Sequence, residues 1–438
     1  MQLVFSKIIE TKSIRLWSGA KGRAEYERMR RVIGKDIKSP LDDKKISEAL
    51  LSNSVGSLSV HGDLILLHDP SDIRKEHSRQ LENLGKVKSL KKQIINGYGS
   101  FNTVVVDVFG KNLRLLDTEI YSNRSPDYVT KAELKKQEKE CTKTATDDER
   151  TRYDKVKELV IKEEYVNLSL ITRRQLKEIS GRLKSKKGVG KLTHVLDRGF
   201  DDEPLFDFID SELNDKLVIR LKVSRVSEET EIDSQGKERR IKLINQNFPD
   251  SDERRYQKIV IKNKVHQDVR CILSWGNKLG KYAVVKIQLI KRDGTAIFRQ
   301  PLLLLTNYDV LDKEMAFCIY RIYLKRSKIE GVFKFLKEVL GWEEFRVRDF
   351  ESIKTLLTLC YFVAGYFYEI ESLLIQQDFI QFIAELGGGK GKITRYYILQ
   401  GFSSLIIKHT ADKLIEKHAI TPDKLIEIMK WAQMGGFM

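Results

Sequence analysis

The sequence predicts an α/β protein with a strand-and-helix core, an inserted β subdomain, and helical regions at both ends. Three observations indicate this fold class. Short apolar runs of strand length alternate with charged stretches of helical length between residues 64 and 220. Residues 258–287 instead alternate apolar and polar side chains, which is the period of a half-exposed strand. Beyond about residue 370, apolar stretches of helical character predominate.

The first elements are a basic helical region and three strands. Residues 1–55 are expected to be helical, with much of their positive charge in residues 21–23 and 28–31. This region is either a small DNA-binding module or a set of surface helices with solvated arginines. We predict strands at 64–67, 103–106 and 112–120, with turns at Gly97-Tyr98-Gly99 and Gly110-Lys111.

Residues 125–155 are dense in Lys, Glu and Asp and predict an exposed insertion or mobile linker. A helical region then runs to about Lys186, followed by a strand at 192–196, a short helix at 202–211 and a strand at 217–220. Three strands, helix, strand, helix, strand, closed by a later helix, is the order of a ribonuclease-H-like fold.

The chain therefore divides, by prediction, into four parts. Residues 1–55 form the basic N-terminal region, and residues 56–220 with 301–370 form the ribonuclease-H-like core. The alternating segment at 221–300 is the inserted β subdomain, and residues 371–438 form a helical C-terminal region.

Composition favours a polyanionic partner. The 438 residues carry a formal net charge of +17, and the pI is near 9.4. The alternative is a ribosome-associated or merely Lys-rich protein. Cys141, Cys271, Cys318 and Cys360 form no CxxC pair, so neither a zinc ribbon nor a disulfide framework is indicated. We expect a reduced, cytosolic chain without a signal peptide, whose longest apolar run is too short to span a membrane.

One predicted helix carries Tyr323, Arg326, Glu330 and Lys337 in the register Y-x2-R-x3-E-x6-K. At ~100° per residue these side chains fall within an arc of roughly 60°. An acid beside two cations and a phenol suits a metal ion next to a phosphate, because the carboxylate can ligate the metal while the others hold phosphate oxygens. The alternative is a solvated, salt-bridged helix face.

Metal-assisted phosphodiester chemistry needs further carboxylates at neighbouring strand ends. Asp197 directly follows a predicted strand, and Gly199 permits the tight turn after it. Its alternative role is to cap the next helix. For the remaining acid, Asp69 ends the first predicted strand and precedes Pro70, whose fixed φ is expected to start a turn. Asp107 and Asp63 are its rivals.

These motifs resemble the DDE transposases of the bacterial insertion-sequence-four group, which includes the transposon-five enzyme. The likeness rests on the Y-x2-R-x3-E-x6-K register, the D-x-G-F pattern at Asp197, the apolar strand at 302–307 before the signature and the apolar helix at 353–367 after it. It covers roughly residues 64–367. Because this family places its first acid on the first strand, Asp69 is preferred to Asp107.

The resemblance implies a cut-and-paste transposase in which Asp69, Asp197 and Glu330 hold Mg²⁺, with Mn²⁺ as a substitute. In such enzymes water attacks the phosphodiester at the transposon end, and the freed 3′-hydroxyl then attacks a second phosphodiester. Tyr323, Arg326 and Lys337 would then bind phosphates of the DNA end. The basic stretch with Arg220, Lys222 and Arg225 resembles one that contacts DNA in relatives; otherwise these are sheet-edge solubility residues.

The resemblance also implies double-stranded DNA as partner and a homodimer on DNA, held together by the C-terminal region. Its apolar stretches, the last after the helix start at 421–423, could instead fold back on the core.

Relatives stack a flipped base on a Trp where this chain has Pro301 or Leu302, and Trp275 is either a substitute or a packing residue. The expected location is the bacterial cytoplasm, on the nucleoid. The alternatives are a metal-dependent nuclease without strand transfer and a non-catalytic DNA-binding derivative.

Overall fold

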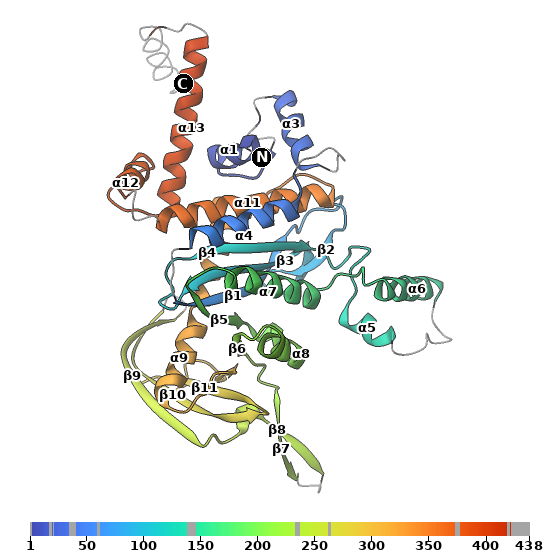
Figure 1. Ribbon diagram of the computed structural model, residues 1–438, viewed down its shortest axis with the longest axis vertical. Coiled ribbons are helices and arrows are strands. Elements are labelled where there is room, and N and C mark those ends of the chain that lie inside the picture. The colour runs from blue at the N-terminus through green and yellow to red at the C-terminus, as the bar shows by residue number, and fades with distance from the viewer. Residues whose placement is uncertain are drawn as a thin grey trace. The chain divides into compact units, whose positions relative to one another are not determined.

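The computed structural model describes residues 2–16, 20, 22–34, 41–58, 62–137, 146–232, 237–261, 264–372, 377–417 and 421. Two compact units make up the chain (Figure 1). One consists of Lys44–Lys334, and the other combines Met1–Asp43 with Phe335–Met438. We call them the sheet unit and the helical unit.

A mixed ten-stranded sheet dominates the sheet unit, in the order β2-β3-β1-β5-β6-β12-β11-β10-β9, with β4 paired to β3 (Figure 1). Only the β1–β5 and β5–β6 pairs are parallel. A separate hairpin consists of β7 (Val226–Ile232) and β8 (Glu238–Lys242). The sheet strands are β1 (Gly62–Arg74), β2 (Gly85–Lys88), β3 (Ile94–Asp107), β4 (Arg114–Tyr121), β5 (Val189–Leu196), β6 (Lys216–Arg220), β9 (Asp250–Ile261), β10 (Lys264–Leu279), β11 (Tyr282–Ile290) and β12 (Leu302–Thr306).

Helices cover both faces of this sheet. On one face, α4 (Asp43–Ser57) and α7 (Leu168–Lys184) enclose a core in which Leu51 and Ile179 meet Leu66. On the other face, α9 (Lys313–Leu324) packs on β6, β10, β11 and β12, and α10 (Ser327–Lys334) packs on β1. The sheet unit also contains α5 (Lys131–Gln137), α6 (Asp147–Ile161) and α8 (Glu203–Asp207), the last followed by a π-helix at Phe208–Glu212.

Strand β1 is longer than the sequence predicts. It passes through Asp69 and Pro70 and stays paired with β3 as far as Arg74. Its parallel pairing with β5 ends at Leu67, so Pro70 lies where β1 has β3 on one side only. A proline is tolerated there because its missing N–H is not needed by a second neighbour. The prediction that Pro70 starts a turn is therefore wrong.

The turn predicted at Gly97-Tyr98-Gly99 is also wrong, since these residues lie inside β3. A Cβ on Gly97 would stand 2.4 Å from the carbonyl oxygen of Ile73, and one on Gly99 would stand 2.4 Å from the ring of Tyr121. Glycine is therefore required at both positions because a neighbouring part of the chain approaches closely, and not because of a turn.

The charged stretch at 125–155 contains α5 and the start of α6, and Thr146 and Glu149 form a capping box.

Helices form the other unit. Among the residues that the structure describes, they are α1 (Gln2–Thr11), α3 (Arg23–Ile33), a π-helix at Phe335–Val339, α11 (Phe350–Ser372), α12 (Gln377–Leu386) and α13 (Arg395–Lys417). The apolar helix predicted at 353–367 is confirmed as α11, which is buried along most of its length and packs with α1, α3 and α13. Buried Trp342 fixes the loop before α11 by donating to the carbonyl of Leu357 at 3.1 Å.

The apolar residues predicted after the helix start at 421–423 lie outside the described residues, as does Cys141. Within the described chain, no helix combines the length and apolar character needed to cross a membrane.

Candidate active site

The signature residues do not lie on one continuous helix. Tyr323 belongs to α9 and Glu330 to α10, while Arg326 lies in the joint between them. The backbone of Arg326 donates to the carbonyl of Tyr323 at 3.0 Å, a bond that spans three residues rather than four. Such bonds tighten the turn and rotate the following residues relative to an α-helix. The predicted single helix is therefore interrupted at the residue that carries the guanidinium.

Arg326 gathers the three predicted acids. Its Nη2 donates to Asp69 Oδ2 at 2.9 Å, and its Nη1 donates to Glu330 Oε1 at 2.8 Å. The same Nη2 lies 3.8 Å from Asp197 Oδ2. The hydroxyl of Tyr323 donates to Asp197 Oδ1 at 3.2 Å. We name the three carboxylates of Asp69, Asp197 and Glu330 the acidic site.

Strand pairing explains why the first two acids converge. β1 and β5 run parallel, with Leu67 opposite Val195 as their last pair, and each acid follows two residues later. Parallel strands carry corresponding residues to the same edge of a sheet, and alternation keeps both side chains on the same face. That is the face on which α10 packs against β1.

A buried polar chain ties the same two strands together on the opposite face. His68 and His194, both fully buried, are joined by a 2.9 Å hydrogen bond between Nε2 and Nδ1. His194 Nε2 lies 3.2 Å from Asp215 Oδ2, and His68 Nδ1 lies 2.8 Å from Thr103 Oγ1. Sequence reasoning missed this chain. The signal was present as a polar His within each apolar strand, one residue before Asp69 and three before Asp197.

The electrostatics of the acidic site follow from partial burial. Burial raises the pKa of Asp69 to about 6, although Arg326 acts to lower it. For Arg326 burial alone would lower the pKa, but Asp69 and Asp197 raise it above its ordinary value. Burial and the neighbouring Asp197 raise the pKa of Tyr323 to about 12, so its hydroxyl stays a proton donor.

The rival acids bond to backbone elsewhere. The carboxylate of Asp107 accepts from the backbone of Phe109 at 2.9 Å and of Lys111 at 2.7 Å, and so closes the turn between β3 and β4. Asp63 accepts from the backbone of Lys191 at 2.8 Å. Neither contacts the guanidinium of Arg326 among the described contacts.

The other residues predicted to bind DNA do not all lie at the acidic site. Arg220 Nη1 lies 3.7 Å from Asp197 Oδ1, at the rim of the acidic site, and the Lys222 side chain is exposed. Arg225 is held by carboxylates, with Nη1 lying 3.5 Å from Asp201 Oδ1 and Nη2 bonded to Glu203. Lys337 belongs to the helical unit, where it pairs with Glu343 at 3.3 Å.

Trp275 does not suit the stacking role considered for it. It is only 5% exposed, on β10. We therefore assign it to packing, because a base could not reach the face of its ring.

The acidic site fits a hard divalent cation, because its available ligand atoms are all carboxylate oxygens. The three carboxylates also lie around a single cationic group, the guanidinium of Arg326. As the described side chains lie, no three His, Cys, Asp or Glu groups are close enough together to hold a metal ion.

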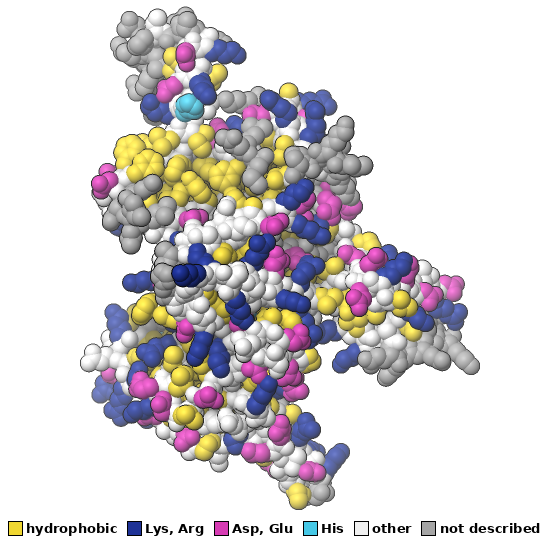
Figure 2. Space-filling model, viewed as in Figure 1, with side chains coloured by type: hydrophobic (Ala, Val, Ile, Leu, Met, Phe, Trp, Pro, Cys, Tyr) yellow, Lys and Arg dark blue, Asp and Glu magenta, His cyan; other side chains and the backbone are white. Residues whose placement is uncertain are grey.

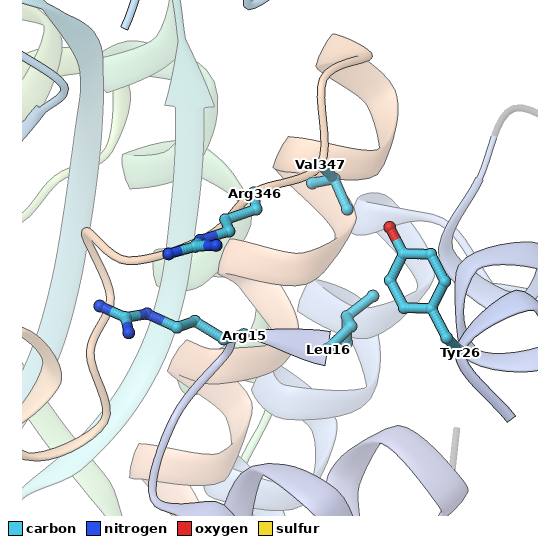
Figure 3. Close-up of a pocket in the computed structure, with 5 residues that line it drawn as sticks. All are labelled: Arg15, Leu16, Tyr26, Arg346 and Val347. Carbon is cyan, nitrogen blue, oxygen red and sulfur yellow. The ribbon is translucent and has the colours of Figure 1, made fainter. Parts of the chain in front are cut away.

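A second concave site lies within the helical unit. It is a pocket of about 240 Å³ lined by Arg15, Leu16, Tyr26, Arg346 and Val347. Figure 3 shows the side chains of Arg15 and Arg346 extending in the same direction, away from Tyr26. Arg15 Nε also pairs with Glu344 at 3.1 Å. Two neighbouring guanidinium groups at a pocket can bind a phosphate.

Comparison with known proteins gives one family. Residues 172–364 match the family model described as a transposase DDE domain. The matched segment runs from α7 into α11 and contains Asp197, Arg326 and Glu330, whereas Asp69 precedes it. No curated protein matches the sequence. Because the match covers less than half of the 438 residues, it shows similarity to a transposase DDE domain over this segment and supports a DDE transposase.

Proposed function

We propose that this chain is a cut-and-paste DDE transposase of the insertion-sequence-four group, with Asp69, Asp197 and Glu330 as its three acids. The observation that carries the proposal is the convergence of these carboxylates on Arg326, from two strands and a helix far apart in the sequence. The family match supports the reaction class, and the contact of Arg326 with Asp69 supports a third acid outside the matched residues.

The three carboxylates would hold Mg²⁺ or Mn²⁺. When bound, the metal lowers the pKa of a water ligand and stabilises charge on the phosphate. Tyr323 orients Asp197 by its hydrogen bond, and Arg220 at the rim is placed to donate hydrogen bonds to a DNA phosphate. No Ser, Cys or Tyr nucleophile is needed, because water and a 3′-hydroxyl are the attacking groups.

A ribonuclease-H-like core is part of the proposal. Its support is the strand order β4-β3-β1-β5-β6, in which β3 runs antiparallel to its neighbours and β1, β5 and β6 run parallel. Strands β9 to β12 extend this sheet rather than forming a separate one. Arg15 of the N-terminal region lines the pocket in Figure 3 together with Arg346, and this pair of arginines supports a DNA contact to which the N-terminal region contributes.

One experiment separates the proposed function from its alternatives. The protein is incubated with Mg²⁺ or Mn²⁺ and DNA that carries the ends of its own element. Joined products indicate a transposase, cleavage without joining indicates a nuclease, and a mobility shift without cleavage indicates a DNA-binding derivative.

DNA binding should weaken steeply with salt, because each neutralised phosphate releases counterions with a slope of about −0.9 per contact in log–log form. We expect Arg220→Ala and Lys222→Ala each to flatten the slope by about one unit. Fluorescence anisotropy across a salt series measures it. Arg255→Ala is the matched control, since Arg255 is also an exposed arginine of the same sheet. A loss of slope confined to Arg255→Ala would place the DNA on the inserted strands instead.

We also propose a dimer that pairs two DNA ends through the C-terminal region. Its support is a group of exposed apolar side chains on α12 and α13, and Figure 2 shows hydrophobic side chains gathered over these helices. They are Phe379, Phe382, Leu386, Tyr396 and Ile407. Burying such a surface against a second copy is favourable.

Light scattering on the protein–DNA complex tests the dimer. We expect a mass of two protomers with two DNA ends, and Phe382→Ser should shift the complex toward one protomer per end. Ser404, exposed on α13, offers the control Ser404→Ala, which should leave the mass unchanged. A complex of one protomer per end in the unaltered protein would rule the dimer out.

A further inference from the structure

We propose that Arg326 is a built-in competitor of the divalent metal: its guanidinium neutralises the acidic site when no metal is bound, and it must leave before a metal can bind. This inference rests on the proposed function, in which the same three carboxylates are the metal ligands. It adds that, in the metal-free protein, the Arg326 side chain lies between the carboxylates and blocks the metal site.

The contacts place Arg326 where a metal would have to be. A single guanidinium bonds Asp69 and Glu330 at 2.9 and 2.8 Å and approaches Asp197 to 3.8 Å. A divalent cation would draw on the same carboxylates, since Mg²⁺ and Mn²⁺ take oxygen ligands. Either cation can compensate the clustered negative charge, but the guanidinium takes up the space between the carboxylates.

Burial makes this neutralisation strong. Arg326 and Asp69 have side chains only 17% and 11% exposed, so their attraction is screened less than that of a surface pair. Without the guanidinium, the partly buried carboxylates would repel each other. A metal that relieves this repulsion would bind with a more favourable free energy. Arg326 therefore lowers the metal affinity of the acidic site by stabilising the metal-free state.

The guanidinium is nevertheless incompletely bonded. Arg326 Nε is buried and has no hydrogen-bond partner within the described part of the chain. Buried donors of a permanent structural contact are usually satisfied. The residue also lies at the joint between α9 and α10, bounded by three-residue hydrogen bonds. A phosphate could accept from Nε and a terminal nitrogen together, so DNA is the ligand suited to draw Arg326 off the carboxylates.

Mn²⁺ affinity of the full chain without DNA tests the competition, measured by titration calorimetry and by electron paramagnetic resonance of free Mn²⁺. We expect Arg326→Gln to bind Mn²⁺ about tenfold or more tightly than the unaltered protein, the usual size of a coupling between two ligands. Arg220→Gln is the matched control and should change the affinity less than about twofold, because among the described contacts Arg220 approaches only Asp197 of the three acids, at 3.7 Å. Equal or weaker Mn²⁺ binding by Arg326→Gln would overturn the proposal.

Three further variants distinguish failure of the competition from failure of the metal site. Arg326→Lys retains the charge but donates from one atom, so its Mn²⁺ affinity should lie between those of the unaltered protein and Arg326→Gln. If Arg326→Gln does not fold, an Arg326→Lys affinity no higher than that of the unaltered protein overturns the competition. Mn²⁺ binding unaffected by Asp69→Asn and by Glu330→Gln would instead reject the proposed metal site itself.

Discussion

Glu330→Gln is expected to abolish DNA strand cleavage while DNA binding survives. The substitution keeps the size of the side chain but removes a charged metal ligand, and losing several kcal/mol of metal-assisted stabilisation slows cleavage by about a thousandfold or more. The basic surface that neutralises DNA phosphates is unchanged. Cleavage of labelled DNA ends in Mg²⁺ measures the first effect, and a binding titration measures the second.

Glu314→Gln is the matched control for this variant. Glu314 on α9 is 61% exposed and pairs with Arg254 at 3.2 Å, while Glu330 is 60% exposed and pairs with Arg326. The two substitutions therefore remove similar carboxylates and similar ion pairs. Cleavage at the unaltered rate by Glu330→Gln would remove Glu330 from the catalytic set, whereas equal losses in both variants would indicate a general effect of charge.

Asp69→Asn should abolish cleavage, and Asp107→Asn should not. The two aspartates are equally buried, at 8% exposed, on neighbouring strands. Asp69 contacts the guanidinium that gathers the acidic site, so its charge is needed there. Asp107 accepts hydrogen bonds only within its own turn. Its replacement should instead lower the free energy of unfolding by about 1–3 kcal/mol, because an Asn oxygen cannot accept every donor that the carboxylate serves.

Cleavage assays and thermal unfolding of both variants decide between these two residues. The expected pattern is loss of cleavage for Asp69→Asn, and retained cleavage with a lowered free energy of unfolding for Asp107→Asn. The reverse pattern would move the first acid from Asp69 to Asp107.

Sequence periodicity placed most of the sheet. The strands at 64–67, 103–106, 192–196 and 217–220 are all present, because apolar runs between charged segments are buried on both faces in a helix-covered sheet. Their ends were harder to predict. β1 continues through Pro70 because one neighbouring strand has already ended, and no local pattern carries that information.

The acidic site could also be predicted only in part from the sequence. The sequence singled out the three acids and Arg326 from spacing and resemblance, but it placed the signature on one helix. The break between α9 and α10 depends on bonds that span three residues, and neither proline nor glycine marks it. The contact of Arg326 with Asp69 joins residues far apart in the sequence, so helical spacing alone could not predict it.

The buried chain of polar side chains behind the acidic site has a direction. Thr103 donates its hydroxyl proton to Gln175, so it must accept from Nδ1 of His68. Nε2 of His68 is then an acceptor, and Nδ1 of His194 supplies the proton between the rings. A slip of β1 by one residue would turn His68 to the other face, so Nδ1 of His194 would lose its acceptor and Thr103 would lose the donor that His68 supplies. These hydrogen bonds therefore favour the one register of β1 and β5 in which Asp69 and Asp197 lie side by side.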